Sequence, residues 1–366
     1  MPPTTSLVEL ARRCAEQLLL PAAERVDVEG VPRSHLDALG AAGLLGLTGP
    51  PAYGGAGAGA GAPVVREVTE ALAGACAATW FVTTQHAMPL AVLGGSGNRA
   101  LQDRWLRAMC TGGALAGVAV AHVRRPGEPA VRAVRVAGGW RFDGHVGWMT
   151  SWGLCDVLLL GGLSPDGELV FVLVPAVEGA GLTASAPMRL AAMQATSTVT
   201  LDLSAFEVPD GSVASVEPAG AWLEQDRVKT ANVSAAVFGI QADVVRRLAA
   251  TAERRGDGTA TELAERLSAE ACMLRQAAYG LVDDVPAAEQ VQERLRLRAA
   301  ALALLVRSAT ALVAATGGSA MGLDNAAQRH LREAAFMLVQ AQTGPVREAT
   351  LRGLLEQGAA QRPVGR

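Results

Sequence analysis

The spacing of apolar residues changes twice along the chain, and this constrains the fold more than any other feature. Residues 1–112 carry apolar side chains at helical spacing. Residues 113–215 contain short β-rich runs separated by turn sequences such as Arg-Pro-Gly and Ser-Pro-Asp-Gly. Helical spacing returns in residues 216–366. The pattern predicts an N-terminal helical domain, a central antiparallel β-barrel or sandwich, and a C-terminal four-helix bundle.

Two details of this pattern are specific enough to be checked. The segment Pro50–Pro63 is dominated by glycine and alanine, which predicts a loop. The first helix of the C-terminal bundle is expected to run without interruption over residues 221–255 and to end at Gly256-Asp257-Gly258.

Composition excludes several classes of partner. Hydrophobic residues make up 50% of the chain and the net charge is −3, which argues against binding to nucleic acid or to an anionic membrane. The five cysteines are far apart and form no Cys/His cluster, so we expect reduced thiols and no metal site. The N-terminal residues 1–17 mix arginine with glutamate, unlike a signal peptide. No uncharged apolar run reaches the roughly 18–20 residues of a membrane span. We therefore expect a cytoplasmic protein without a membrane partner.

One loop near the C-terminus combines bare backbone with a lone acid. Gly317-Gly318 follows a long apolar helix, and Asp324 precedes the next helix. Paired glycines stop a helix and let a ligand approach the backbone closely. A lone carboxylate there is a candidate general base. Aspartate is also a favoured residue at a helix N-cap, so the residues alone leave both interpretations of Asp324 open.

Several motifs resemble those of the acyl-CoA dehydrogenase superfamily, of which this chain would be a divergent member. The sequence PPAYGGAG at Pro50–Gly57 is similar to a loop of that family, and LSAFEVPDGSV at Leu203–Val213 is similar to the exit from its β domain. The order of helices, small β domain and helical bundle fits the same family. The resemblance covers nearly the whole chain and implies a flavoprotein that binds FAD.

The most specific resemblance lies in GGWRFDGHVGWMTSWGLCDVLLLGG. It matches a family strand pair that lies along the flavin ring, with Trp148 packing at the ring, Thr150 hydrogen-bonding its reactive edge and Ser151 adjoining them. Such contacts are physically reasonable, because a flat ring binds by stacking and its electron affinity depends on nearby hydrogen bonds. The resemblance thus implies that Trp148, Thr150 and Ser151 bind the cofactor.

The Gly-Gly loop also aligns with the family without a gap. Gly317 and Gly318 fall on its cofactor-side glycines, and Asp324 falls on the catalytic glutamate. Thr343 resembles a flavin-contacting threonine further along. An aspartate is one methylene shorter than a glutamate, and an error of about 1 Å matters in proton transfer. Asp226 is a second candidate base, ranked below Asp324, because some family members place their glutamate near this position.

Other family elements have changed. His122 falls near the glutamate of the family's Leu-Thr-Glu-Pro stretch and is a candidate substrate contact. The element that supplies an arginine to the flavin pyrophosphate is shortened here, and Arg254 or Arg255 would serve in its place. Lys229 is the cation nearest to the expected CoA-binding arginine.

The resemblance implies α,β-dehydrogenation of an acyl thioester, carried by CoA or by a carrier, with hydride transfer to flavin. Two alternatives remain open at the level of sequence. One is a flavin-dependent monooxygenase of the same fold, and the other is a non-catalytic partner subunit of a hetero-oligomeric dehydrogenase. The resemblance also implies a homo-oligomer, a tetramer or dimer, with a paralogous subunit as a further option.

Overall fold

The computed structural model describes residues 6–57 and 60–360. The first five residues of the stretch judged unlike a signal peptide, and two residues of the predicted Pro50–Pro63 loop, lie outside these ranges. The chain divides into two compact units. The N-terminal unit contains residues 1–72 and 78–223, and the C-terminal unit contains residues 73–77 and 224–366. The N-terminal helices and the sheet belong to the same unit, and the predicted three-domain boundaries stay a prediction.

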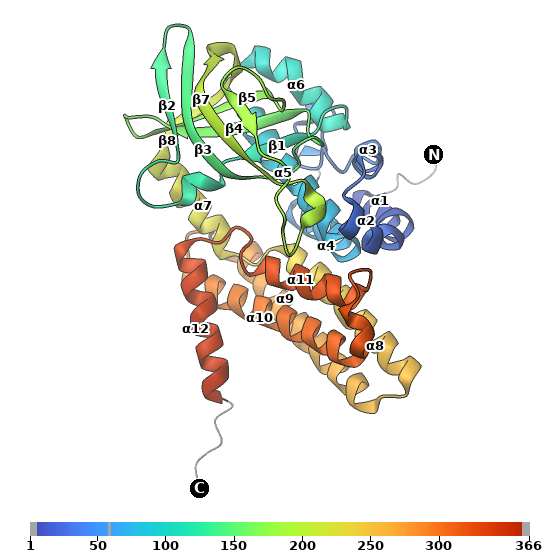
Figure 1. The fold of residues 1–366 in the computed structure, drawn as a ribbon. Coiled ribbons are helices and arrows are strands. Elements are labelled where there is room, and N and C mark those ends of the chain that lie inside the picture. Colours follow the sequence, from blue (N-terminus) through green and yellow to red (C-terminus); the bar gives the residue numbers. More distant parts are fainter. Residues whose placement is uncertain (1–5, 58–59, 361–366) are drawn as a thin grey trace. The chain divides into compact units, whose positions relative to one another are not determined.

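The N-terminal unit begins with helices that follow the predicted apolar spacing (Figure 1). The α-helices are α1 (Leu7–Cys14), α2 (Ala23–Glu29), α3 (Arg33–Ala41), α4 (Ala62–Ala75), α5 (Ala77–Gly94) and α6 (Arg99–Thr111). Helix α6 illustrates how local sequence sets the boundaries. Asn98 accepts a hydrogen bond from the Leu101 amide at its start, and Gly112 takes a left-handed conformation at its end.

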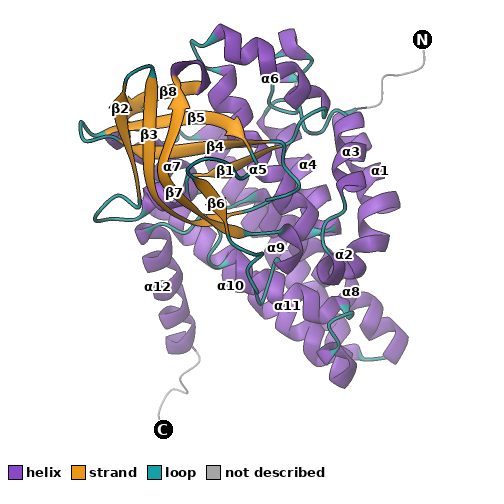
Figure 2. Cartoon of the chain, turned by 45° about the horizontal axis from the view of Figure 1, so that its top comes forward, coloured by secondary structure: helices purple, strands orange, loops and turns teal. Residues whose placement is uncertain are grey.

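The sheet of the N-terminal unit has eight strands (Figure 2). They are β1 (Ala116–Ala119), β2 (Val131–Val136), β3 (Gly139–Met149), β4 (Val157–Leu163), β5 (Glu168–Pro175), β6 (Leu182–Ala184), β7 (Val199–Pro209) and β8 (Val213–Pro218). The order is β6-β7-β3-β2-β4-β5-β8, with β1 paired to β4.

This sheet is mixed, so the prediction of a purely antiparallel domain was wrong in that detail. β4 pairs in parallel with both β1 and β2, while the other pairs are antiparallel. The chain reverses once between β2 and β3 and again between β3 and β4, so β4 runs in the same direction as β2.

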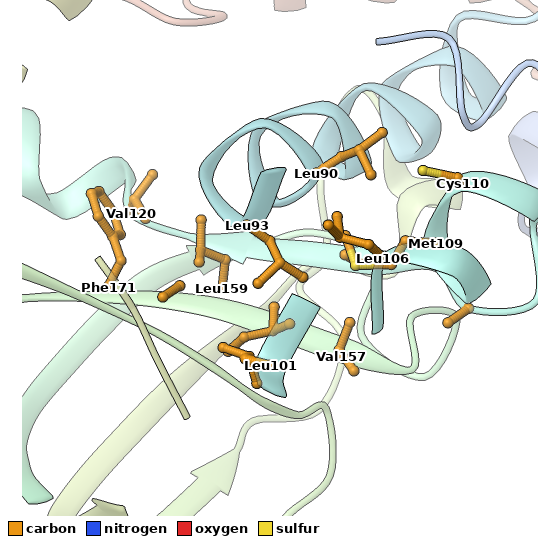
Figure 3. Packing of buried hydrophobic residues seen from close by; sticks show 14 of the residues in the cluster. Leu90, Leu93, Leu101, Leu106, Met109, Cys110, Val120, Val157, Leu159 and Phe171 are labelled. Atoms are coloured by element: carbon orange, nitrogen blue, oxygen red, sulfur yellow. The ribbon is translucent and has the colours of Figure 1, made fainter. Parts of the chain in front are cut away.

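Helices α5 and α6 supply the apolar side chains that bury strands β4 and β5 (Figure 3). Leu93, Leu106 and Met109 belong to the same fully buried cluster as Val157 and Phe171. Strands β4 and β5 are almost continuously apolar because their central residues are buried on both faces.

Helices α3 and α6 approach each other backbone to backbone at Gly40 and Gly112. A Cβ atom at Gly40 would lie 2.8 Å from the Cα of Gly112. We therefore expect Gly40→Ala to lower the free energy of unfolding by about 1–3 kcal/mol, since the helices must separate. Gly220→Ala is the control, because nothing lies within 4 Å of its Cβ position. Urea unfolding followed by tryptophan fluorescence measures both; equal stability of the two variants would contradict the expectation.

The C-terminal unit is helical. Its elements are α7 (Ala219–Ala231, which starts in the N-terminal unit), α8 (Ala235–Arg255), α9 (Gly258–Asp284), α10 (Val291–Thr316), a 3₁₀ turn at Gly317–Met321, α11 (Ala326–Met337) and α12 (Gly344–Ala360). Helix α10 is central and packs against α8, α9, α11 and α12. Its length and apolar composition would also suit a membrane span, but a core helix passes the same test. The predicted fold class is confirmed: N-terminal helices, a central sheet and a C-terminal helical domain.

The expected single helix over residues 221–255 is in fact two helices. α7 ends at Ala231 and α8 starts at Ala235, with Ser234 in an extended conformation before it. The break is held from outside, because the Asn232 Oδ1 accepts a hydrogen bond of 2.7 Å from Arg294.

Arg294 also holds the connection between α9 and α10. Its guanidinium is buried and donates to the backbone carbonyls of Leu281, Val285, Pro286 and Glu289. These carbonyls lie at and beyond the end of α9, where helical partners are missing. One side chain therefore provides a donor for four backbone carbonyls of this connection.

All five cysteines are free. Cys76, Cys110 and Cys155 are buried, whereas Cys14 is half-buried and Cys272 is exposed.

Candidate functional site

The residues expected to bind the flavin ring lie at the end of β3. Trp148 is 45% exposed, while Thr150 and Ser151 are buried. The backbone of Ser151 has a φ of 71°, which turns the chain sharply after the strand. The Ser151 amide donates to the Thr196 carbonyl at 2.9 Å, and the Trp152 amide donates to the Ser197 carbonyl at 3.1 Å. The exposed ring is therefore carried on a segment with a well-anchored backbone.

Three buried threonines, Thr150, Thr198 and Thr196, lie in a row at the end of β3. Met149 and Val199 are register partners in the β3–β7 pair, which brings Thr150 opposite Thr198. Their hydroxyl oxygens are 3.1 Å apart, and that of Thr198 is 3.0 Å from that of Thr196. Thr196 in turn donates to the Met193 carbonyl at 2.8 Å. The sequence did not reveal this row, because Thr196 and Thr198 precede a strand without a motif of their own.

His122 lies in a short 3₁₀ turn, Ala121–Arg124, between β1 and β2. Its Nε2 lies 2.8 Å from the Gly161 carbonyl and must donate to it. The Nδ1 is buried and has no hydrogen-bond partner. Burial lowers the pKa of His122 to about 4, and the nearby Arg125 charge adds to this effect, so the ring is neutral at pH 7. His122 therefore holds an unused, buried hydrogen-bond acceptor.

The turn that carries His122 lies beside the end of β3. The Arg125 guanidinium is 3.9 Å from the position that a Cβ of Gly147 would occupy, next to Trp148. Asp156, which the same motif contains, has a structural role. Its Oδ2 accepts from the Leu115 amide at 2.7 Å and from Arg33 at 3.2 Å.

The Gly-Gly loop of the C-terminal unit continues from α10 as a 3₁₀ turn. Gly317 has a φ of 74°, and nothing lies within 4 Å of the Cβ position of Gly318. Of the two arginines considered for this region, Arg255 reaches the loop: its Nη2 donates to the Thr316 carbonyl at 2.7 Å. Arg254 is exposed and donates instead to the Thr251 hydroxyl at 3.0 Å. The role of Arg254 as a cofactor contact stays a prediction.

Asp324 does not cap helix α11, so that interpretation was wrong. The N-cap is Asn325, whose side chain accepts from the Ala327 amide at 2.9 Å. Asp324 lies one residue earlier and is exposed. Asp226 on α7 is buried. The roles of both acids as base stay predictions.

Lys229 and Thr343 lie near a common anchor. Arg298 of α10 is buried and donates to the Thr230 carbonyl, and its Nη2 donates to the Gln340 carbonyl at 2.7 Å. This links the end of α7, where Lys229 is exposed, to the connection before α12, where Thr343 is half-buried.

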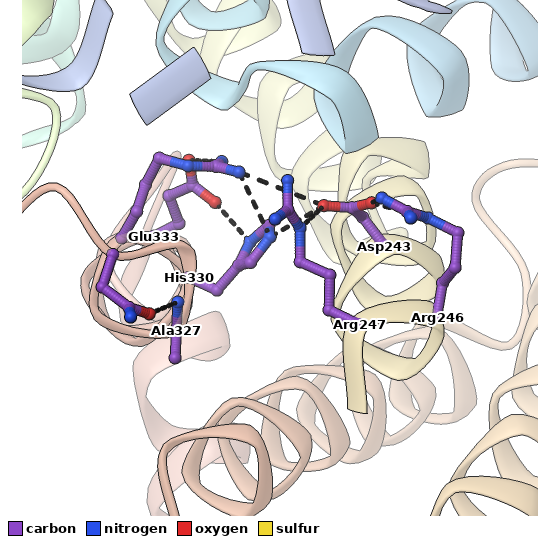
Figure 4. Close-up of polar contacts among 8 residues, drawn as sticks. Asp243, Arg246, Arg247, Ala327, His330 and Glu333 are labelled. Carbon is purple, nitrogen blue, oxygen red and sulfur yellow. Dashed lines mark hydrogen bonds and ion pairs between the residues drawn. The ribbon is translucent and has the colours of Figure 1, made fainter. Parts of the chain in front are cut away.

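A buried group of charged residues joins α8 to α11 (Figure 4). The His330 Nε2 lies 2.9 Å from a carboxylate oxygen of Asp243, and its Nδ1 lies 2.8 Å from one of Glu333. Arg329 donates to Glu333 at 2.7 Å. Each ring nitrogen of His330 thus faces a carboxylate, and a carboxylate accepts hydrogen bonds. We call Asp243, Arg329, His330 and Glu333 the buried charge network.

The acids of this network are held ionised. Burial alone would raise the pKa of Glu333, but the charges of Arg329 and His330 overcome it and lower the pKa to about 2. Burial likewise opposes ionisation of Asp243, and His330 and Arg247 together hold its pKa well below the usual range. The sequence showed Arg329 and Glu333 four residues apart on one helix, but gave no sign of Asp243 as their partner.

Each unit holds residues whose chemistry suits a part of a flavin nucleotide. In the N-terminal unit, Trp148 offers an exposed flat ring, and Thr150, two residues further on, has a buried hydroxyl. In the C-terminal unit, Gly317 and Gly318 offer backbone without side chains, and the Arg255 guanidinium lies 3.8 Å from the Cβ position of Gly317. Bare backbone next to a guanidinium suits a phosphate group. Among the described residues, no group of histidine, cysteine and acidic side chains is arranged to hold a metal ion.

Comparisons with known proteins find one family profile and many solved structures of the same fold. Residues 3–113 match the family profile of the acyl-CoA dehydrogenase N-terminal domain. A comparison with curated protein sequences finds no significant match. The family match is thus confined to residues 3–113, whereas the fold is shared with solved structures over nearly their full length.

Butyryl-CoA dehydrogenase from Megasphaera elsdenii superposes with a TM-score of 0.77 at 17% identity, covering 97% of this chain and 96% of that one. A glutaryl-coenzyme A dehydrogenase in complex with glutaryl-CoA gives a TM-score of 0.80 at 18% identity, covering 100% and 98%. FkbI, described as acting in biosynthesis of the methoxymalonyl extender unit of the polyketide Fk520, gives 0.74 at 22% identity, covering 96% and 100%. The match of residues 3–113 to the family profile and the shared fold together confirm the resemblance to the acyl-CoA dehydrogenase superfamily that the motifs suggested.

Proposed function

We propose that the protein is an FAD-dependent oxidoreductase that desaturates an acyl thioester between its α and β carbons. The observation that carries this proposal is the end of β3, where an exposed Trp148 and a buried Thr150 stand two residues apart, just before a turn with an anchored backbone. These are the positions at which the family holds its flavin. When bound, the flavin supplies the acceptor for a hydride.

The residues of the chain would divide the remaining tasks. Trp148, Thr150 and Ser151 would bind the flavin ring, and Gly317, Gly318, Arg254 or Arg255, and Thr343 would bind the rest of the cofactor. Lys229 and His122 would contact the thioester, which is attached to CoA or to a carrier. Asp324 would remove the α-hydrogen as a proton.

Asp324 sets a condition on this proposal. It is exposed in the single chain, whereas a carboxylate is a better base when water is excluded. The bound thioester or a second subunit must therefore cover it. Helix α12 supports assembly, because its Leu351, Leu354 and Leu355 are 49%, 52% and 75% exposed. A homodimer or homotetramer would bury them, and light scattering would show its mass.

The proposal is tested with the purified protein. We expect the absorbance of oxidised flavin, and its loss when an acyl-CoA from a panel of chain lengths is added without oxygen. Asp324→Asn should slow this bleaching by about 10²–10⁴-fold while flavin is retained. Asp202→Asn, at an exposed acid on β7, is the matched control.

Each other result has a definite meaning. Slow bleaching in Asp226→Asn but not in Asp324→Asn would make Asp226 the base. Protein without flavin, and unable to bind it, would contradict the proposal and favour the non-catalytic subunit. The exposure of Asp324 favours one second candidate, a monooxygenase of the same fold, which requires no such base; a requirement for O₂ and a flavin reductase would identify it.

A further inference from the structure

The three threonines in a row at the end of β3 can donate their hydroxyl hydrogens in only one direction. Each hydroxyl has one hydrogen and can also accept. Thr196 donates to the Met193 carbonyl, which has no hydrogen to give. Its hydrogen is therefore used, and Thr198 must donate in the contact of 3.0 Å to Thr196.

The direction of the hydrogen bond between Thr150 and Thr198 is fixed by that between Thr198 and Thr196. The hydrogen of Thr198 is used on Thr196, so Thr150 must donate in the contact of 3.1 Å to Thr198. All three hydroxyls are buried, with Thr150, Thr198 and Thr196 at 7%, 4% and 0% exposure, so water does not offer an equal alternative partner. The hydrogen of Thr150 is thus bonded to Thr198, and only the lone pairs of its oxygen are available to a further partner.

We infer that Thr196, Thr198 and Thr150 form a directional hydroxyl chain that makes Thr150 a hydrogen-bond acceptor and so favours reduced over oxidised flavin. This inference rests on the proposed function, in which Thr150 lies at the reactive edge of the flavin. The N5 atom at that edge carries a hydrogen when the flavin is reduced and a lone pair when it is oxidised. Thr150, as an acceptor, can therefore bond to the N5 hydrogen of the reduced form. To donate to N5 of the oxidised form, it must first give up its hydrogen bond to Thr198.

Thr196 is thus a positioning residue. It accepts the hydrogen of Thr198, and Thr198 in turn accepts the hydrogen of the Thr150 hydroxyl. With valine at position 196, Thr198 loses its acceptor and can donate to Thr150 instead. The hydrogen of Thr150 is then free to bond to oxidised flavin. The backbone bonds from Ser151 to Thr196 and from Trp152 to Ser197 do not depend on these side chains, so the turn after β3 is kept.

The experiment measures the dissociation constants of oxidised FAD and of dithionite-reduced FAD for each variant. We expect Thr196→Val to lower the ratio of the oxidised to the reduced constant about tenfold, since one hydrogen bond is gained by the oxidised form. A tenfold change corresponds to about 30 mV in a two-electron potential. Thr198→Val should act in the same direction, and serves if the first variant folds poorly.

The matched controls are Thr196→Ser and Thr198→Ser, which remove a methyl group but keep the hydroxyl. They should leave the ratio unchanged. Equal shifts in the serine and valine variants would show a packing effect and overturn the inference, as would no shift in either valine variant.

A second measurement does not need flavin. Neutron diffraction from deuterium-exchanged crystals locates the hydrogen of each hydroxyl directly. We expect deuterium on the Thr196, Thr198 and Thr150 oxygens pointing toward Met193, Thr196 and Thr198 in turn. Deuterium of Thr150 pointing away from Thr198 would overturn the inference whether or not flavin binds, whereas absence of flavin binding in both redox states would overturn the proposed function as well.

Discussion

Asp243→Asn should lower the free energy of unfolding by about 3–5 kcal/mol, the range found when one partner is removed from a buried ion pair. Asparagine has nearly the same shape, so the loss would come from charge and hydrogen bonding. The His330 ring is fully buried and would face a neutral amide in place of a carboxylate 2.9 Å away. Far-UV circular dichroism during urea unfolding measures this, because the network joins two helices.

Asp202→Asn provides the matched control. Asp202 also bonds to a histidine, with its Oδ1 2.7 Å from the His145 Nδ1, but the two side chains are 68% and 54% exposed. Exposed pairs contribute about 1 kcal/mol or less. A loss of similar size in both variants would show that burial of the charge network has no special effect.

Acidification should destabilise the N-terminal unit well before its carboxylates are protonated. Burial lowers the pKa of His86 and of His122 to about 4. His86 is held neutral by its geometry, because its Nδ1 accepts from the Ala116 amide at 2.9 Å while its Nε2 contacts the Met109 carbonyl at 3.2 Å. Unfolded, both histidines would take up a proton near pH 6.5.

The free energy of unfolding should fall as the pH falls, because both histidines have a lower pKa in the folded state than in the unfolded state. The stabilising effect is complete above about pH 6.5 and is lost as the pH falls toward 4, since the unfolded chain binds protons that the folded one rejects. Each histidine accounts for about 3 kcal/mol across this window, at 1.36 kcal/mol for each pKa unit. All six tryptophans lie in the N-terminal unit, so their fluorescence during urea unfolding at pH 7, 5.5 and 4.5 reports on it.

A variant with both His86→Gln and His122→Gln should have a flatter dependence of stability on pH, because glutamine does not titrate. His145→Gln, at an exposed site, should retain the steep dependence. The same slope in all three proteins would mean that other groups cause the acid sensitivity.

The order of helical and β segments could be predicted because it depends on patterns of neighbouring residues in the sequence. Periodicity distinguished the helices from the β-rich segment, and turn sequences marked the strand ends. The direction of β4 could not be predicted, because it depends on how strands pair after they form. The break between α7 and α8 was missed for a similar reason: Asn232 is held by Arg294, 62 residues away.

Some residues of the candidate site could likewise be found from the sequence, and others could not. Trp148 and Thr150 were found because a contiguous motif carries them. Asp243 and His330 are 87 residues apart, and Thr150 and Thr198 are 48 apart, so no local pattern connects either pair. The capping residue of α11 was misassigned by one position, since adjacent Asp324 and Asn325 have equal preference for an N-cap and only the backbone decides between them.

The buried guanidinium of Arg294 affects which positions in the connection between α9 and α10 should tolerate substitution. Arg294 holds this connection through four carbonyls, a group that every amino acid possesses. Substitution of a side chain within the turn should therefore leave these acceptors in place, whereas substitution of Arg294 removes the donor of all four hydrogen bonds. Lysine there would keep the charge but could not replace a planar group with five donors.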